Sequence, residues 1–268
     1  MSRPLDVIIV SYNTRADTLA CLASVFAHPP RDLHTVLVVD NASSDGTVEA
    51  IRGPWPAAKV VALERNVGFA AANNVGFRET TAPLVLLLNS DTTVPAGAID
   101  TLVDRLDATG VVAAGPRLVN DAGRPEVSFG RMLTPAVEAG QLLRGRLARS
   151  RAAWARRRTE RHVSAEREVD WVSGACLLVR RNAALAAGLF DERFFLYEED
   201  VDFCAALRAH GGRVLFTPRA TVGHRGGRSG APRSGAYDRS HLLFYDKHAP
   251  QWTPWLRAWL RLRGRAVR

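Results

Sequence analysis

Short apolar runs alternate with helical patterns through the first half of the chain, and this alternation restricts it to few folds. Four runs have the length and composition of strands, at residues 5–10, 35–39, 59–63 and 84–88. Strands joined by helices form a parallel sheet through right-handed crossovers, and the wholly apolar run at 84–88 fits a strand buried on both faces. We therefore predict a Rossmann-like α/β fold, with a mostly parallel central sheet and helices on both faces.

Local signals indicate where some of the elements begin. Thr14 and Asp17 have the spacing of a capping box, and Pro95 suits the first turn of a helix. In the second half, residues 170–180 and 213–216 are expected to form strands.

Polar residues stand directly after all four strands of the first half. One such cluster is an ordinary turn, but four that meet at one edge of a sheet are difficult to explain by packing. The clusters are Ser11, Tyr12 and Asn13; Asp40 and Asn41; Arg65 and Asn66; and Asn89, Ser90 and Asp91. Because open sheets bind ligands beyond the carboxyl ends of their strands, the sequence predicts a ligand site there.

The predicted crevice lacks the common phosphate-binding loops. No GxGxxG follows the first strand, no GxxxxGK[ST] occurs, and there is no GxSxG nucleophile elbow. A diphosphate bound without a cradle of glycine amides needs a cation to balance its charge. Asp91 is the candidate ligand, because Mg²⁺ and Mn²⁺ take carboxylate oxygens together with phosphate oxygens.

The composition is that of a soluble globular chain. Of 268 residues, 47% are hydrophobic and 24% charged, which suits one large domain, or one with an appendage, without disulfide or zinc. Cys21, Cys176 and Cys204 are isolated from one another, which fits a reducing compartment. We expect neither a signal peptide nor a membrane span, since no run reaches about 18 apolar residues. A cytoplasmic protein is therefore expected.

Four carboxylates stand within five residues at 198–202, before a predicted helix. Acids at a helix N-terminus complement the helix dipole, which accounts for one or two of them. Four repel one another and raise at least one pKa, which favours a proton-accepting role. The small residues at 173–175 would let a ligand approach closely. The second half is thus expected to bind an acceptor and to supply a base.

Positive charge is concentrated in two segments of a chain whose net charge is +9. Residues 144–167 hold nine arginines and two glutamates, and five arginines but no acid follow Trp252. Arginine interleaved with tryptophan and leucine is typical of a helix on anionic lipid. The structural alternative is a solvated helix face, with tryptophans that pack the tail onto the domain. A nucleic-acid site is disfavoured, because acids that line a groove repel phosphate.

Six segments resemble the inverting family-2 glycosyltransferases of the GT-A fold, in the order that this family has them. They are VIIVSYNTRADTLACLASV, VVDNASSDGT, RNVGFAAANNVGF, LLLNSDT, VSGACLLVRR and FDERFFLYEEDVDFCAALRAHG, between about residues 5 and 230. The likeness is greatest to the bacterial rhamnosyltransferase-like branch. It implies a metal-assisted transfer of a sugar from a nucleotide, with inversion, to an acceptor hydroxyl.

The resemblance implies roles for the residues at the strand ends. Asp40 would accept a hydrogen bond from the pyrimidine N3–H, a task that suits a group with acceptors only. Asn73 would reach sugar hydroxyls, and an exposed helix position is its alternative. Asn89 stands where the family's DXD motif has its first Asp, so Asp91 would carry most of the binding of Mg²⁺ or Mn²⁺. The implied donor site comprises Ser11, Tyr12, Asn13, Asp40, Arg65, Asn66, Gly68, Asn73, Asn89, Ser90 and Asp91.

For catalysis, the resemblance implies Asp200 as the general base, with Glu199 as the second choice and Asp202 as structural. No covalent intermediate is required. His224 belongs to a glycine-rich stretch at 221–229, expected to be a loop, and would touch metal or diphosphate when that loop closes. An exposed histidine is the alternative reading.

The chain is expected to divide into a nucleotide-sugar half at 1–115, an acceptor and catalytic half at 116–230 with a basic insert at 139–168, and an amphipathic basic tail at 231–268. The expected donor is dTDP-L-rhamnose, with UDP-sugars second. A glycan, a polyprenyl-linked sugar or a natural product would be the acceptor, with peripheral contact at the anionic inner face of the cytoplasmic membrane. A nucleotidyltransferase is disfavoured because the N-terminus lacks a glycine-rich basic loop. A non-catalytic nucleotide-sugar binder stays open because of Asn89.

Overall fold

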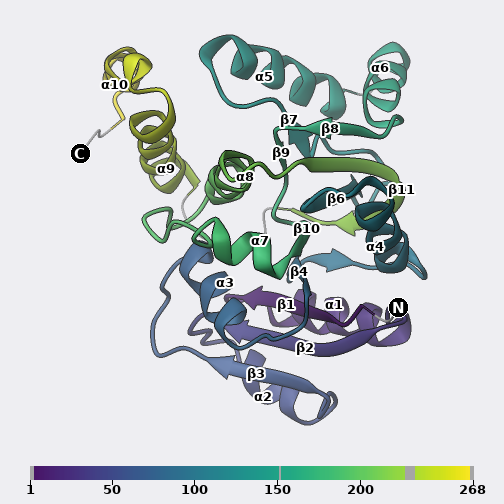
Figure 1. Cartoon of the computed structure of the whole chain (residues 1–268). Coiled ribbons are helices and arrows are strands. Elements are labelled where there is room, and N and C mark those ends of the chain that lie inside the picture. Colours follow the sequence, from purple (N-terminus) through teal and green to yellow (C-terminus); the bar gives the residue numbers. More distant parts are fainter. Residues whose placement is uncertain (1–2, 151, 227–232, 266–268) are drawn as a thin grey trace.

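The computed structural model describes residues 3–150, 152–226 and 233–265. A nine-stranded sheet forms its centre, with helices on both faces (Figure 1). The strand order is β3-β2-β1-β4-β10-β6-β11-β5, and β8 pairs with β11 off this path. The strands are β1 Leu5–Ser11, β2 Leu33–Asp40, β3 Ala58–Ala62, β4 Leu84–Asn89, β5 Thr92–Thr93, β6 Ala113–Val119, β8 Arg167–Val169, β10 Cys176–Arg180 and β11 Val214–His224. A separate pair joins β7 Phe129–Gly130 to β9 Trp171–Val172.

The predicted α/β fold is confirmed. Strands β1 to β4 pair in parallel, and β6 and β11 run in the same direction as these four. Strand β10 is inserted antiparallel between β4 and β6. The helices are α1 Arg15–Ala27, α2 Thr47–Arg52, α3 Phe69–Arg78, α4 Ala98–Thr109, α5 Pro135–Arg149, α6 Ala153–Val163, α7 Arg181–Ala186, α8 Glu199–Ala209, α9 Arg233–His248 and α10 Thr253–Leu262, with a short 3₁₀ turn at Pro250–Trp252.

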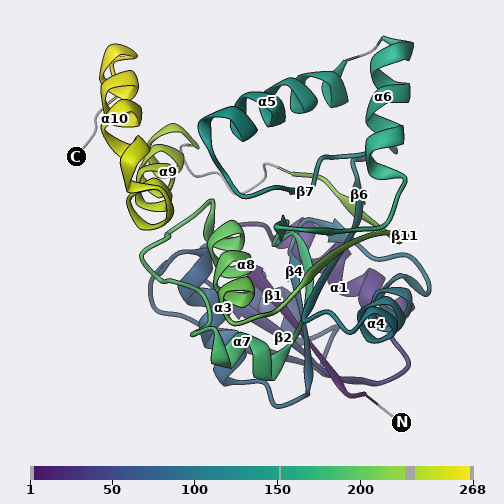
Figure 2. The same cartoon turned by 45° about the horizontal axis from the view of Figure 1, so that its top comes forward.

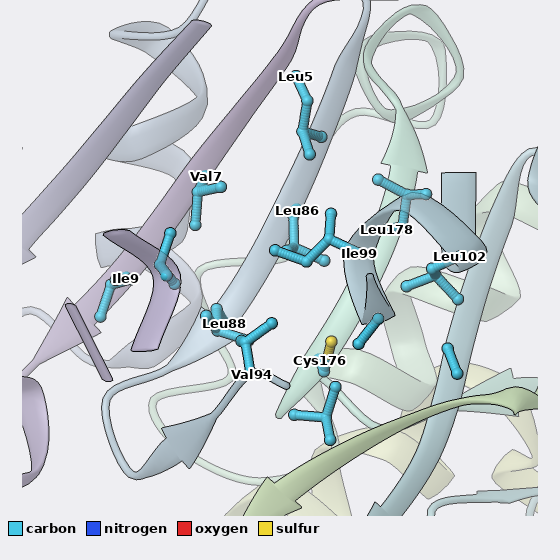
Figure 3. Close-up of a cluster of buried hydrophobic side chains, with 14 of the residues drawn as sticks. Leu5, Val7, Ile9, Leu86, Leu88, Val94, Ile99, Leu102, Cys176 and Leu178 are labelled. Carbon is cyan, nitrogen blue, oxygen red and sulfur yellow. The ribbon is translucent and has the colours of Figure 1, made fainter. Parts of the chain in front are cut away.

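Two apolar cores lie on the two faces of the sheet, because successive side chains of a strand point to opposite faces. Val7 and Ile9 of β1 pack on one face with α1 and α4, whereas Ile8 packs on the other with α3 and α8. Figure 3 shows the first core, in which Ile99 of α4 lies over Leu86 of β4. Burial on both faces explains why the central strands read as continuous apolar runs.

Three local predictions are wrong, each for a physical reason. Thr14 makes no side-chain cap to α1, because its hydroxyl is hydrogen-bonded to Ser90 Oγ at 2.9 Å. Pro95 lies before α4, which begins at Ala98 after a turn closed by the bond from Ala98 N to Pro95 O. The expected strand at 170–180 is two strands, since the residues at 173–175 leave the sheet direction between β9 and β10.

The strand expected at 213–216 also differs. It continues as β11 to His224, with a register shift between Thr217 and Thr221. His224 therefore stands at a strand end, and not in a loop, and pairs with Thr92 of β5. The rest of the glycine-rich stretch, 227–229, lies outside the described residues.

Helices α5, α6, α9 and α10 lie together at one end of the molecule, away from α2 and β3 (Figures 1 and 2). A third apolar cluster joins α9 to α8, with Phe244 and Tyr245 packed against Phe194 and Val201. Among the described residues, no helix has the length and apolar character needed to cross a membrane.

The three cysteines are free and buried in different layers of the fold. Cys21 belongs to α1, Cys176 to β10 and Cys204 to α8. Burial raises the pKa of the Cys21 and Cys204 thiols to about 12.

Candidate active site

A cavity of about 790 Å³ opens where the parallel strands β1, β2 and β4 end. Residues of the first half line one side of it, and the segment 173–175, the loop 195–198 and the start of α8 line the other. Its walls comprise Val10, Tyr12, Thr14, Asn41, Asn66, Gly68, Phe69, Asn89, Ser90, Asp91, Ser173, Gly174, Ala175, Phe195, Leu196, Tyr197, Glu198, Glu199, Asp200, His224, Tyr237 and Arg265. The cavity thus lies at the edge of the sheet where the polar strand ends meet.

Six of the eleven residues expected at the donor site line this cavity, and five do not, among them Asp40, which is described below. Ser11 is fully buried and bonded to Thr18 Oγ1 at 2.8 Å, and Asn73 is buried with its amide donating to Phe69 O at 2.9 Å. Asn13 accepts a hydrogen bond from Ser44 N, which ties two loops together. Arg65 is exposed. The exposed position that was the alternative for Asn73 is also wrong.

Asp40 does not line the cavity; it is the last residue of β2, next to the lining residue Asn41, with only 2% of its surface exposed. Its Oδ2 accepts a hydrogen bond from Ser43 N at 2.9 Å, whereas Oδ1 is buried with no partner among the described residues. A buried carboxylate oxygen without a donor is costly, so this atom is suited to accept an N–H from a ligand.

Asn41, the next residue, lines the cavity; the sequence placed it in the polar cluster but gave it no role at the donor site. Its side-chain Nδ2 donates to Asn66 Oδ1 at 2.9 Å, and its side-chain Oδ1 accepts from Val67 N at 2.9 Å. The end of β2 is thereby fixed to the loop before α3. The polar cluster at 40–41 was visible in the sequence, but nothing in it separated the two roles.

Gly68, in the lining of the cavity, contacts Phe195 at the start of the loop 195–198, which leads to the acids of α8. Its φ is +90°, and a Cβ placed there would lie 2.6 Å from Phe195 O. The next amide, Phe69 N, donates to the same oxygen at 2.7 Å. Only glycine combines this backbone angle with so close a neighbour.

Asp91 and His224 lie close together in the lining of the cavity. His224 Nε2 is 3.4 Å from Asp91 Oδ1, and its Nδ1 is 2.9 Å from Glu126 Oε2. Burial lowers the pKa of His224, but the two carboxylates outweigh it and raise that pKa to about 9. Burial in turn raises the pKa of Asp91, yet His224 brings it below its ordinary value. Glu126, which we did not predict, completes this charged group.

The donor atoms present fit a divalent cation only in part. Within the described residues, no three or more His, Cys, Asp or Glu side chains are placed to hold a metal by themselves. Asp91 supplies a carboxylate, and Asn89 Oδ1, nearby in sequence, is buried and has no partner in the part of the chain that the structure describes. Mg²⁺ and Mn²⁺ are often held by one or two carboxylates, with the remaining ligands from substrate phosphates and water. The site suits a cation that arrives with a diphosphate.

The acidic cluster lies across the cavity from Asp91, at the start of α8. Asp200 Oδ2 accepts from Gly174 N and its Oδ1 from Val201 N, both at 2.8 Å. Burial raises the pKa of Asp200 despite these two bonds, and burial with the neighbouring Asp200 charge raises that of Glu199 well above its ordinary value. Two carboxyl groups with raised pKa values in one cavity are suited to accept a proton.

Asp202 takes no part in the cavity. It is buried between Lys247 at 2.8 Å and His248 at 2.6 Å, both on α9. This acid therefore fastens α9 to α8.

Tyr237 and Arg265 come to the cavity from the C-terminal segment, and nothing in the sequence pointed to them. Tyr237 of α9 lies edge-on to Tyr197, with ring centroids 5.9 Å apart. Arg265 follows α10 and pairs with Asp238 at 2.7 Å. Both lie far along the chain from the other wall residues, so only the packing of α9 on α8 brings them there.

Comparison with known sequences gives two findings. The family model described as glycosyl transferase family 2 matches residues 6–184. The chain is 32% identical, over 97% of its own length and 90% of the relative's, to the N-acetylglucosaminyl-diphospho-decaprenol L-rhamnosyltransferase of Mycobacterium tuberculosis.

Comparison with solved structures finds the same fold. GalNAc-T7, crystallised with UDP, GalNAc and Mn²⁺, superposes with a TM-score of 0.68 at 16% identity, over 94% of this chain and 50% of that one. The mannosyltransferase PcManGT from Pyrobaculum calidifontis, in complex with GDP-Man and Mn²⁺, gives 0.63 at 19% identity, over 96% and 69%. This chain thus spans only half of the first of these proteins.

Proposed function

Because this chain belongs to glycosyl transferase family 2, and is therefore a glycosyltransferase, we propose that it moves L-rhamnose from dTDP-L-rhamnose, with inversion, to a hydroxyl of a polyprenyl-diphosphate-linked sugar. The Mycobacterium tuberculosis relative supports this acceptor and this sugar, since its name includes both. One observation carries the proposal: a single cavity holds polar strand ends on one wall and the acids of α8 on the other.

The donor nucleotide would lie over the ends of β1 and β2. Asp40 Oδ1, buried without a partner, would accept the N3–H of thymine or uracil, which a purine base does not offer in that form. Tyr12, Asn41 and Asn66 line the adjoining wall and would contact the nucleoside and the sugar.

A divalent cation, Mg²⁺ or Mn²⁺, would be held by Asp91 and would neutralise charge on the diphosphate of the donor. His224 Nε2 is 3.4 Å from Asp91 Oδ1, so this side chain would touch the cation or the diphosphate. Asn89 occupies the place of a second carboxylate, so this chain supplies fewer charges to the cation than a DXD motif would.

Asp200 would act as general base, with Glu199 as the second candidate. The acceptor hydroxyl would give its proton to an Asp200 oxygen as its own oxygen bonds to the anomeric carbon. The bond to the nucleoside diphosphate breaks on the opposite face, and its electron pair leaves with the diphosphate. The amides of Gly174 and Val201 hold the Asp200 carboxylate in place for this transfer.

The tail would place the enzyme at an anionic membrane surface on the cytoplasmic side, where a polyprenyl carrier lies. The last turns of the described chain expose four apolar side chains at helical spacing, which we term the tryptophan stripe: Trp252, Trp255, Trp259 and Leu262. Arginines at 257, 261 and 263 flank it. Exposed Leu142 and Leu143 on α5 lie at the same end of the molecule (Figure 2). Apolar stripes with flanking arginine suit anionic lipid.

In this proposal residues 1–115 bind the nucleotide sugar, 116–230 bind the acceptor and supply the base, and 231–268 face the membrane. Strand β10 comes from the second part but pairs with β4 of the first. The two halves would therefore act as one folded unit with a shared sheet.

Thermal unfolding with dTDP, UDP or GDP, each with and without Mn²⁺, tests the donor assignment. A ligand at about 100 times its Kd stabilises a protein by about 2.7 kcal/mol, so Tm should rise by several degrees. We expect a Mn²⁺-dependent rise with dTDP that is smaller with UDP, absent with GDP and lost in Asp91→Asn. The absence of a rise with any nucleotide would overturn the donor site, and a larger rise with UDP would reassign the donor to a UDP-sugar.

A further inference from the structure

A buried ion-pair cluster stands directly behind the acidic loop of the cavity. His241 of α9, 5% exposed, lies between two carboxylates. Its Nδ1 is 2.6 Å from Glu198 Oε1, and its Nε2 is 3.3 Å from Glu138 Oε2 on α5. Glu198 itself lines the cavity, two residues before Asp200. The cluster thus connects two helices, α5 and α9, to the wall that carries the acids.

Aromatic side chains of α9 enclose the imidazole. Tyr237 stacks on the His241 ring, with centroids 5.2 Å apart and planes 18° from parallel. Tyr245 packs edge-on to it at 5.1 Å and donates its hydroxyl to Glu138 Oε1 at 2.6 Å. The ring is therefore held in orientation from both sides.

The turn that this cluster holds has an unusual backbone. Tyr197 and Glu198 have φ of +73° and +64°, which is uncommon outside glycine and carries strain for two successive residues. Such a turn persists only where its surroundings hold it. Ser240 donates to Leu196 O at 2.7 Å, and its neighbour His241 binds Glu198, so α9 holds the turn at two points. Glu199 and Asp200 follow at once, as the first residues of α8.

We propose that His241 is a positioning residue for the transfer, which fixes the turn at 197–198 through Glu198 and offsets the negative charge beside Asp200. The proposal rests on the proposed function in that Asp200 is the base. His241 would not touch substrate, and its effect would reach the reaction through Glu198.

The charges around the cluster agree with this role. Burial lowers the pKa of His241, but Glu138 and Glu198 outweigh it and raise that pKa to about 10, so the ring is an imidazolium at neutral pH. Burial raises the pKa of Glu198, and His241 opposes that rise. The charge of Asp200 raises the pKa values of the neighbouring acids Glu198 and Glu199. Without the imidazolium, Asp200 would face these acids uncompensated and would ionise at higher pH.

His248 provides a matched control on the same helix. His248 pairs with Asp202, in the first turn of α8, at 2.6 Å, the same distance at which His241 pairs with Glu198, just before that helix. Asp202 does not line the cavity. A merely structural role for His241 predicts that His241→Gln and His248→Gln behave alike, with a lower Tm and an unchanged pH profile.

The first measurement is the dependence of kcat on pH in both variants. Donor binding is measured separately, as the rise in Tm that the nucleotide causes. In His241→Gln we expect the acid limb of the profile to move up by about one unit, so that kcat below that limb falls about tenfold, while dTDP still raises Tm. His248→Gln should keep the wild-type profile. Equal profiles in the two variants would overturn the proposal.

The second measurement does not depend on turnover, and so separates this proposal from the proposed function. Nitrogen-15 spectra of labelled histidine in the wild type should show the His241 ring as an imidazolium up to about pH 9, and the Glu198→Gln variant should bring its titration toward the ordinary value. A wild-type ring that titrates near pH 6.5 would overturn the proposal, whether or not sugar transfer is found.

Discussion

At the scale of single residues, several oxygen atoms at the cavity are buried without a hydrogen-bond partner among the described residues. They are Asp40 Oδ1, Asn89 Oδ1, Glu198 Oε2 and Glu199 Oε2. Each such atom costs about 1–3 kcal/mol unless something pairs with it. Their positions beside the strand ends and at the start of α8 coincide with the places where base, diphosphate and acceptor would lie. They therefore give the most direct local tests.

Asp40→Asn should weaken the binding of dTDP and UDP by about 10- to 100-fold, the worth of a hydrogen bond to a charged group. In this variant an NH2 group would replace Oδ1, so two hydrogen-bond donors, this NH2 and the N3–H of the base, would point at each other. Isothermal titration measures the change. Asp45→Asn is the control, because Asp45 is engaged by Arg15 N and Thr47 within the neighbouring loop. Unchanged dTDP affinity in Asp40→Asn would remove Asp40 from base recognition.

Asp200→Asn should lower kcat by about 10²- to 10⁴-fold, with the KM for the donor within about twofold, since it removes the proton acceptor together with one of the two hydrogen bonds from Gly174 N and Val201 N. Glu199→Gln should lower kcat by a smaller factor than Asp200→Asn does. If Glu199→Gln loses more than Asp200→Asn, the base is Glu199. Steady-state kinetics with each variant distinguish the two.

The pH profile of the wild type follows from the same pair. The base must be ionised, and burial raises the pKa of both Asp200 and Glu199. Activity should therefore fall as pH drops through an apparent pKa above the ordinary 3.8 of Asp, a value that belongs to the pair as a whole.

Which residues of a polar cluster reach the cavity was only partly predictable. Val10 and Tyr12 line it and Ser11 between them does not, because alternate residues of a strand point to opposite sides. Asn73 faces inward on α3 and binds its own helix at Phe69 O. The sequence placed polar clusters at the strand ends, and only some of their members line the cavity, because side-chain direction depends on register and helix rotation, which no motif records.

At the scale of elements, the start of α3 is the joint between the two walls. The helix begins at Phe69, with Gly68 as the residue before its first turn. The contact with Phe195 was not foreseeable, since it joins segments more than a hundred residues apart. The break at 173–175 was missed for a similar reason: Asn89 N donates to Ala175 O and holds that segment beside β4.

Gly68→Ala should destabilise the protein more than Gly97→Ala does. Both glycines have positive φ, +90° and +71°, but a Cβ at Gly97 meets nothing within 4 Å, whereas at Gly68 it meets the Phe195 backbone at 2.6 Å. Gly97→Ala should lower stability by about 1 kcal/mol from backbone strain alone. Thermal unfolding of both variants measures the difference in stability. Equal Tm values would show that the backbone at Phe195 moves aside at no cost in stability.

At the scale of the whole molecule, the sheet order explains how distant segments share one cavity. The apolar alternation predicted the parallel strands of the first half and their helices. It did not predict the antiparallel insertion of β10, because a five-residue apolar strand reads the same in either direction. Nor did it place α9 and Tyr237 at the cavity, since that contact depends on the apolar cluster around Phe244.

The double substitution Trp255→Ser with Trp259→Ser should reduce binding to vesicles of phosphatidylglycerol and phosphatidylcholine at least about tenfold, because both side chains are exposed and belong to the tryptophan stripe. Binding by the wild type should weaken in high salt, as the flanking arginines require. Co-sedimentation measures both effects.

Leu185→Ser is the matched control for that pair, as it removes an exposed apolar side chain from α7. It should bind vesicles like the wild type. If the double variant binds equally well, or if the wild type ignores anionic vesicles and forms dimers instead, the stripe serves another contact.

The three buried cysteines give this protein a built-in set of reporters. One thiol lies in a helix on each side of the sheet, and one within the sheet. A buried thiol, whose pKa is raised by that burial, reacts with an alkylating reagent only when local opening exposes it to solvent. The relative rates at which Cys21, Cys176 and Cys204 are modified in the native protein would therefore tell which layer opens first and whether a bound nucleotide slows that opening, with no foreign label introduced.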